Sequence, residues 1–193
     1  MIAAAALSLL AAMPAMAQQA SGPWLVRARA VHFDSANGDS TGLGLAINNK
    51  MIPEVDVSYF FTPQIAAELI LTIPQKQTLS SFGTPIGSLR HLPPTLTVQY
   101  HFMPQGSVRP YVGAGVNYTR FSSVNLPAGV SIDRSSFGGA LQAGFDIPLT
   151  GNWLLNFDLK KVYIRTDVSA AGTKIGTFKV DPLLLGVGVG YRF

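Results

Sequence analysis

Charged residues of both signs recur at every second position inside otherwise apolar segments of the chain. Arg27 and Arg29, for example, alternate with Val26, Ala28 and Ala30. Side chains at alternate positions of an extended strand project from the same face. An unpaired charge buried on such a face costs on the order of several kcal/mol, so mixed signs predict ion pairs. The predicted interior charge network consists of Arg27, Arg29, Glu54, Asp56, Glu68, Arg109, Asp146, Asp158, Lys160 and Arg192.

The histidines do not indicate catalysis. His32, His91 and His101 are the only ones, and none lies in a recognisable serine-hydrolase context. Nucleophilic catalysis needs a base beside the nucleophile, and the strand order predicted below puts His32 and His101 at opposite ends of the fold. The chain has no cysteine and no metal-ligand spacing. We therefore expect no enzyme activity, no catalytic residues, no cofactor and no metal site.

The charged positions belong to a repeating pattern of strands. Segments of about ten residues alternate apolar with polar or small side chains, separated alternately by short turns and long loops. This pattern is typical of an all-β fold, an eight-stranded antiparallel transmembrane β-barrel with short periplasmic turns and long extracellular loops. The predicted strands are residues 24–33, 53–61, 65–73, 94–102, 108–118, 137–147, 153–164 and the closing stretch 179–193.

The closing stretch indicates which face points outward. From residue 183 its odd positions are large and apolar, while Gly186, Gly188, Gly190 and Arg192 fill even positions. A soluble lipocalin-like barrel would need a polar outer surface. Charged residues make up only 12% of the chain, about half of the roughly 25% usual in soluble proteins. Glycine suits the narrow interior of eight strands, where side chains pack without leaving an aqueous pore. We therefore expect the apolar faces to meet lipid, with no path for ions or protons.

The amino terminus has the pattern of an export signal. An apolar run over residues 2–12 is followed by Pro14 and by Ala15-Met16-Ala17, an A-x-A cleavage site. The run is too short to span a bilayer, which takes about 20 residues. No Lys or Arg precedes it, which departs from the usual signal. We predict that residues 1–17 are a signal peptide and that residues 18–193 form one barrel domain in the Gram-negative outer membrane.

Six stretches of the chain carry a resemblance to a known family. They are GPWLVRARAVHF (22–33), IPEVDVSYFFTPQIAAELILTIP (52–74), LPPTLTVQYHF (92–102), RPYVGAGVNYTRF (109–121), residues 153–167, and KVDPLLLGVGVGYRF (179–193). In this order they resemble the outer membrane protein W (OmpW) family, which is related to alkane-import barrels. The resemblance implies an eight-stranded outer-membrane barrel that lets small hydrophobic molecules cross the lipopolysaccharide leaflet. It implies no enzymatic activity.

Apolar residues in the first two long loops form the candidate substrate path. They have no obvious core beneath them, so we expect them to line an outer vestibule. These residues are Leu43, Leu45, Ile47, Met51, Leu79, Phe82, Ile86, Leu89 and Leu92. Pro53, Pro93, Pro94 and Pro182 lie at the loop-side ends of strands, where the missing N–H interrupts strand pairing. They predict a gap for lateral exit through the barrel wall; the alternative is that each proline simply begins a strand.

The predicted partners are outer-membrane lipids and lipopolysaccharide, small hydrophobic compounds, and the barrel-assembly machinery. The last would recognise the terminal Val189-x-Tyr191-x-Phe193. The net charge of +4 comes without a run of basic residues longer than Lys160-Lys161. It therefore suits anionic headgroups and not nucleic acid. The alternative function is a structural or interaction barrel whose loops bind lipopolysaccharide, a host surface, phage or bacteriocin.

Overall fold

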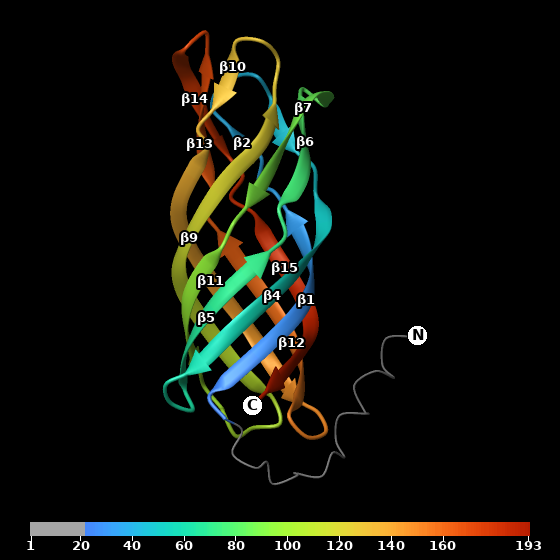
Figure 1. The fold of residues 1–193 in the computed structure, drawn as a ribbon, viewed down its shortest axis with the longest axis vertical. Coiled ribbons are helices and arrows are strands. Elements are labelled where there is room, and N and C mark those ends of the chain that lie inside the picture. Colours follow the sequence, from blue (N-terminus) through green and yellow to red (C-terminus); the bar gives the residue numbers. More distant parts are fainter. Residues whose placement is uncertain (1–21) are drawn as a thin grey trace, which may run out of the picture.

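A computed structural model describes residues 22–193 and shows a tall barrel of antiparallel strands (Figure 1). Eight long strands form its wall. They are β1 (Trp24–Asp34), β4 (Lys50–Phe60), β5 (Ile65–Thr72), β8 (Thr95–His101), β9 (Arg109–Asn125), β11 (Ser135–Pro148), β12 (Trp153–Val162) and β15 (Leu183–Arg192). Each pairs with the next, and β15 pairs with β1, which closes the ring. The predicted fold class is confirmed.

The connections follow the predicted rhythm. Short turns at residues 61–64, 102–108 and 149–152 lie at the lower end of Figure 1, beside the carboxy terminus. Longer connections lie at the upper end. The predicted signal peptide, residues 1–17, lies outside the described residues. Among the residues that are described, no helix is long and apolar enough to cross a membrane.

The long connections are not loops, as the sequence pattern suggested, but mostly short strands that extend the barrel upward. These strands are β2 (Gly38–Asp39), β3 (Leu45–Ile47), β6 (Gln75–Ser81), β7 (Thr84–Leu92), β10 (Val130–Ile132), β13 (Arg165–Ala170) and β14 (Thr173–Lys179). The sequence of these strands does not alternate between apolar and polar residues, because buried positions such as Gln75 and Gln77 are polar. Four of them, β10, β13, β14 and β2, form a separate sheet at the top.

Glycines on β15 make room for the charged side chains that face the barrel interior. Arg27 and Arg29 of β1 lie opposite Gly190 and Gly188. A Cβ atom on Gly188 would lie 2.1 Å from the carbonyl oxygen of Ala28, and one on Gly190 would lie 2.7 Å from Arg27 Cγ. Larger residues would therefore collide with the strand or the arginine beside them. The glycines let two long charged side chains fit inside the narrow barrel.

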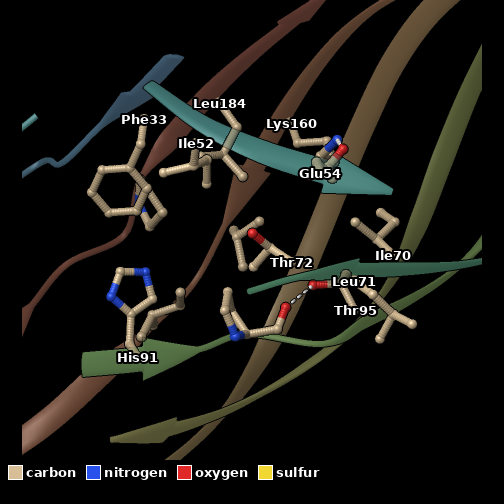
Figure 2. A pocket seen from close by; sticks show the side chains of 14 residues that line it. Phe33, Ile52, Glu54, Ile70, Leu71, Thr72, His91, Thr95, Lys160 and Leu184 are labelled. Atoms are coloured by element: carbon tan, nitrogen blue, oxygen red, sulfur yellow. Dashed lines mark hydrogen bonds and ion pairs between the residues drawn. The ribbon is translucent and has the colours of Figure 1, made fainter. Parts of the chain in front are cut away.

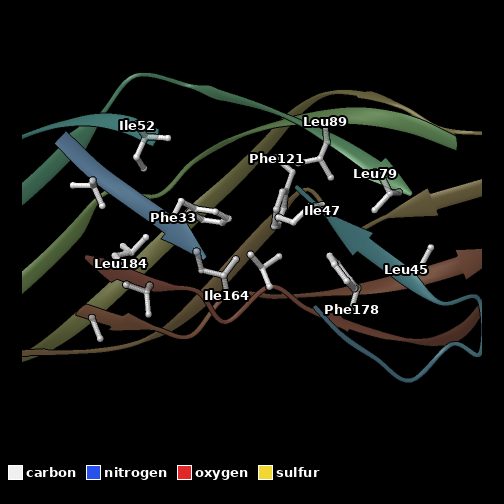
Figure 3. Close-up of a cluster of buried hydrophobic side chains, with 14 of the residues drawn as sticks. Phe33, Leu45, Ile47, Ile52, Leu79, Leu89, Phe121, Ile164, Phe178 and Leu184 are labelled. Carbon is white, nitrogen blue, oxygen red and sulfur yellow. The ribbon is translucent and has the colours of Figure 1, made fainter. Parts of the chain in front are cut away.

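The interior has three layers. At the lower end Leu25, Phe60, Ala66 and Leu154 form a small apolar cluster. Buried charged side chains fill the middle of the barrel. Above them lies the upper cluster, a larger set of buried apolar residues contributed by barrel strands and their extensions (Figure 3). Apolar side chains on the outer face, such as Val98, remain exposed, as a lipid-facing wall requires.

Candidate functional site

Two arginines of β1 organise the middle layer. Arg27 Nε lies 2.9 Å from Asp56 Oδ1, and its Nη2 lies 2.8 Å from Glu68 Oε1. Arg29 Nη1 lies 2.8 Å from Glu54 Oε1, and its Nη2 lies 3.1 Å from Glu68 Oε1. All five side chains are buried. Because each charge has an opposite partner, the network closes the barrel interior without an isolated buried charge.

Lysine and neutral side chains complete this layer. Lys160 Nζ lies 2.7 Å from Glu54 Oε1 and 2.5 Å from Asp158 Oδ1. Tyr111 Oη donates to Asp158 at 2.8 Å, and Asn156 Nδ2 donates to Asp146 at 2.7 Å. These two neutral partners lie on the predicted polar faces, but sequence reasoning did not include them. Only their contacts across the barrel reveal their part in the network.

Two predicted members of the charge network lie below it. Arg109 Nε donates to the carbonyl of Gly106 at 3.3 Å, and Arg192 Nε donates to that of Gly22 at 3.0 Å. The Arg192 guanidinium also lies 3.9 Å from the ring centroid of Phe60. Neither arginine forms an ion pair within residues 22–193. Both sit at the lower mouth because their strands begin or end there.

A small cavity borders the Glu54–Lys160 ion pair (Figure 2). Glu54 and Lys160 line it together with apolar side chains, and its free volume is about 20 Å³, room for about one water molecule. Most of its lining comes from β1, β4, β5, β12, β15 and the β7–β8 connection. The cavity is lined by Phe33, Ile52, Glu54, Ile70, Leu71, Thr72, His91, Pro93, Thr95, Lys160, Val162, Ile164, Pro182 and Leu184.

The cavity reaches the barrel wall where strand pairing is interrupted. The β5–β8 ladder ends at the pair Ile70–Thr95, and pairing of the same hairpin resumes only at Gln75–His91. Leu71 lies in the interruption and lines the cavity, yet its side chain is 43% exposed on the outer face. We call the stretch between these two pairs the wall interruption.

The four predicted wall-gap prolines differ in position. Pro93 and Pro94 lie within the wall interruption, and Pro93 lines the cavity. Pro53 marks the end of the β4–β5 ladder. Pro182 lines the cavity from a paired section, because its carbonyl accepts a hydrogen bond from the amide of Val162 at 3.2 Å. Strand pairing therefore continues beside Pro182.

The predicted substrate-path residues mostly gather in the upper cluster (Figure 3). Leu45, Ile47, Leu79 and Leu89 are buried there, and Leu43 and Ile86 pack against it. Three others lie elsewhere. Met51 is 58% exposed and Phe82 is 78% exposed, while Leu92 is half-buried and outside the cluster.

Strand parity explains two of these exceptions. Met51 and Leu92 neighbour the inward-facing Ile52 and His91, so each projects from the opposite face. Phe82 lies at the tip of the β6–β7 hairpin with φ of 46°, beyond the cluster. A residue inside a predicted loop has no assigned parity, so apolarity alone could not distinguish these three from the buried ones.

His91 also belongs to the candidate site, although the sequence analysis did not include it in the substrate path. Its ring centroid lies 5.5 Å from that of Phe33, and both side chains line the cavity (Figure 2). Burial lowers the pKa of His91 to about 4, and the nearby charge of Lys50 lowers it as well. The imidazole is therefore neutral near pH 7. His91 precedes Leu92 in the chain and lies opposite Gln75 across the hairpin. A correct strand assignment would have shown that it faces inward.

A serine motif and the histidines are the groups to consider for catalysis within residues 22–193. Residues 38–42 (GDSTG) match the pattern G-x-S-x-G, but the required strand–turn–helix context is missing. Ser40 Oγ donates to the carbonyl of Thr177 at 3.1 Å and accepts from its amide. His32 faces outward near the top of β1, whereas His101 is buried at the lower end of β8. No cluster of metal-ligating side chains occurs in residues 22–193.

Comparisons with known proteins agree with this architecture. The family model described as the OmpW family matches residues 21–193. An uncharacterised outer-membrane protein, y4mB, of Sinorhizobium fredii is 41% identical, covering 99% of this chain and 90% of its own. The dibenzothiophene metabolism operon protein PahQ of Pseudomonas aeruginosa is 32% identical, covering 72% and 69%. The crystal structure of the outer membrane protein OprG from Pseudomonas aeruginosa matches with a TM-score of 0.79 and 25% identity, covering 91% and 98%.

Proposed function

The chain belongs to the OmpW family of outer-membrane β-barrels, and from that premise we propose that it is a passive conduit for small hydrophobic molecules. The molecules would enter the upper cluster from outside and leave sideways through the wall interruption into the bilayer. The observation that carries the proposal is the cavity at that interruption. It joins buried apolar side chains to Leu71, which is exposed on the outer face.

The layers of the interior favour a sideways route over a vertical one. Below the cavity, Arg27, Arg29 and Lys160 are held by carboxylates in ion pairs. An apolar molecule cannot replace those partners, so passing downward would leave charges buried without compensation. At the wall interruption the cavity is lined by Leu71, Thr72 and Pro93, which carry no charge. The outward step therefore costs much less than the downward step.

Passage requires side chains to move. A free volume of about 20 Å³ is far below the roughly 300 Å³ of a small ligand pocket. Phe33 and Ile52, which line the cavity from β1 and β4, are the side chains that a hydrophobic molecule would displace. The relative PahQ is named as a dibenzothiophene metabolism operon protein, and dibenzothiophene is a hydrophobic compound of the kind that the proposal requires. Substrates of that size fit the proposal only if the upper cluster repacks around them.

Uptake by whole cells tests this function. Cells with and without the protein would be given radiolabelled octane, and the protein should raise the rate. The Leu89→Asp variant places a carboxylate in the upper cluster and should abolish that gain. Phe82→Asp makes the same kind of change at an exposed hairpin tip and should leave uptake intact. Equal uptake with and without the protein, or with Leu89→Asp and the unchanged chain, contradicts the proposal.

A second candidate is binding of lipopolysaccharide on the outer wall. Arg90, Arg120 and Arg134 are exposed on neighbouring segments, and none forms an ion pair within the described residues. Arg120 lies two residues above Tyr118 on the outer face of β9, at the level expected for lipid headgroups. Arginine forms charge-assisted hydrogen bonds with phosphate. Changing all three to glutamine should release lipopolysaccharide that copurifies with the protein while leaving octane uptake unchanged.

A further inference from the structure

Two polar side chains inside the apolar upper part of the barrel have unused hydrogen-bonding atoms. Nε2 of His91 and both amide atoms of Gln77 are buried and have no hydrogen-bond partner in the described chain. The other such buried atom, Asp56 Oδ2, lies 2.9 Å from Arg29 Nη1 and is therefore neutralised. Buried polar groups are normally paired. An unpaired imidazole and an unpaired amide in one region consequently point to a missing partner.

The two side chains are close neighbours on one hairpin. Gln77 of β6 pairs with Leu89 of β7, and Gln75 pairs with His91. Gln77 and His91 are thus a diagonal cross-strand pair on the same inward face, with side chains near enough to contact one ligand group. Leu79 and Leu89 beside them belong to the upper cluster. His91 lines the cavity at the wall interruption, and its ring lies against Phe33 (Figure 2).

The other polar groups around this pair are already occupied. Gln75 Nε2 donates to the carbonyl of Ile73 at 2.9 Å. Lys160 and Glu54, which line the far side of the cavity, hold each other at 2.7 Å. A molecule in the cavity would therefore meet the free Nε2 of His91. Gln77, whose amide atoms are also free, does not line the cavity itself but lies diagonally beside His91 on the same inward face.

We propose that Gln77 and His91 form a polar subsite for hydrophobic molecules that carry one uncharged hydroxyl group, such as a medium-chain alcohol or a phenol. The subsite deepens the proposed conduit function and rests on it. An amide offers both a donor and an acceptor, and a neutral imidazole nitrogen offers one or the other. A hydroxyl group, which donates once and accepts twice, satisfies this combination. A carboxylate only accepts hydrogen bonds, so it would leave the acceptor oxygen of the Gln77 amide unpaired, and an alkane would leave both side chains unpaired.

Binding of 1-octanol, compared with octane, tests the subsite. The full chain in lipid nanodiscs would be titrated with each compound while the side-chain amide signals of Gln77 and the ring signals of His91 are followed by NMR. Octanol should shift both sets saturably, and octane should shift neither. In cells, Gln77→Leu and His91→Phe should each lower the octanol-to-octane uptake ratio about tenfold, the scale of one to two lost hydrogen bonds.

Gln75→Leu is the matched control. It removes an inward-facing amide from the same strand, but that amide is already paired within the protein, so the uptake ratio should not change. Gel mobility of heated and unheated samples verifies folding of each variant. Unchanged ratios in both Gln77→Leu and His91→Phe, or absence of the octanol shifts, overturns the subsite while octane uptake still supports the conduit. Failure of the protein to speed uptake of either compound overturns the conduit itself, and the subsite with it.

Discussion

Thr72 Oγ1 donates a 2.6 Å hydrogen bond to the carbonyl of Pro53 at the point where the β4–β5 ladder ends. Proline has no N–H to continue the ladder, so a side chain supplies the last bond between these strands. On its other edge, β5 has already separated from β8 beyond Ile70. The upper end of β5 is thus attached to its neighbours more weakly than any regular part of a ladder.

Replacing Thr72 by valine should loosen this end of the wall. The Pro53 carbonyl loses its side-chain donor, which costs about 1 kcal/mol. Backbone amides of residues 71–73 should then exchange with deuterium roughly fivefold faster, as measured by mass spectrometry in nanodiscs. Thr78→Val changes an exposed threonine of β6 and serves as the control. Equal exchange in Thr72→Val and the unchanged chain would show that the hydroxyl does not hold the wall.

Restoring backbone donors at the wall interruption should have the opposite effect. Changing both Pro93 and Pro94 to valine supplies two N–H groups and a residue type that favours strands. The β5–β8 ladder should lengthen upward, and octane uptake should fall severalfold while the amount of folded barrel stays the same. Pro85→Val, at the tip of the same hairpin, should have no effect. Undiminished uptake in the double variant would place the exit elsewhere.

The ion-pair layer should govern stability and not uptake. Glu68 receives hydrogen bonds from Arg27, Arg29 and Gln99, so Glu68→Gln leaves two buried arginines short of a counter-charge. We expect a loss of about 3–5 kcal/mol in urea unfolding from lipid vesicles, with octane uptake per folded molecule unchanged. Lys76→Gln alters an exposed charge and should cost little. A Glu68→Gln barrel of normal stability would contradict the role given to the network.

The membrane-spanning part of the fold follows from sequence because each strand repeats a two-residue period imposed by lipid outside and a crowded interior. That period identified the eight strands and the inward face of Arg27 and Glu68. The upper extensions do not show the same contrast, since inward positions such as Gln75 and Gln77 are polar although they are buried. Their strands were consequently predicted as loops.

The candidate site could be predicted only in its chemical character. The apolar loop residues were expected to line an open vestibule, but most of them pack into a buried cluster. Pro93 and Pro94, which were expected to interrupt strand pairing, lie between the last β5–β8 pair and the first β6–β7 pair. Parity was missing, so Met51 and Phe82 were included although they are exposed. His91 was omitted because a lone histidine in a predicted loop has no assigned neighbours. Its contact with Phe33 joins strands that are far apart in the chain, and no local pattern encodes such a contact.

His91 should make the β6–β7 hairpin sensitive to acid. Burial, and then the charge of Lys50, lowers the pKa of His91 from its ordinary value of 6.5 to about 4. When the hairpin detaches, the solvated ring regains its ordinary pKa. Below pH 6.5 the detached form therefore binds more protons, and the packed form loses stability as pH falls from 6.5 toward 4. Above pH 6.5 both forms are neutral, so stability does not depend on this group.

Deuterium exchange of the hairpin measures this sensitivity. After correction for the intrinsic exchange rate, opening of β6 and β7 should increase by more than roughly tenfold between about pH 6.5 and 4.5, because each pH unit in this window is worth up to a factor of ten. His91→Phe keeps an aromatic ring against Phe33 and cannot bind a proton, so its profile should be flat. If opening of the hairpin in the unchanged chain did not depend on pH, the His91 ring would not be buried in its neutral form and the prediction would be wrong. A slope that persists in His91→Phe would show that His91 is not the group responsible.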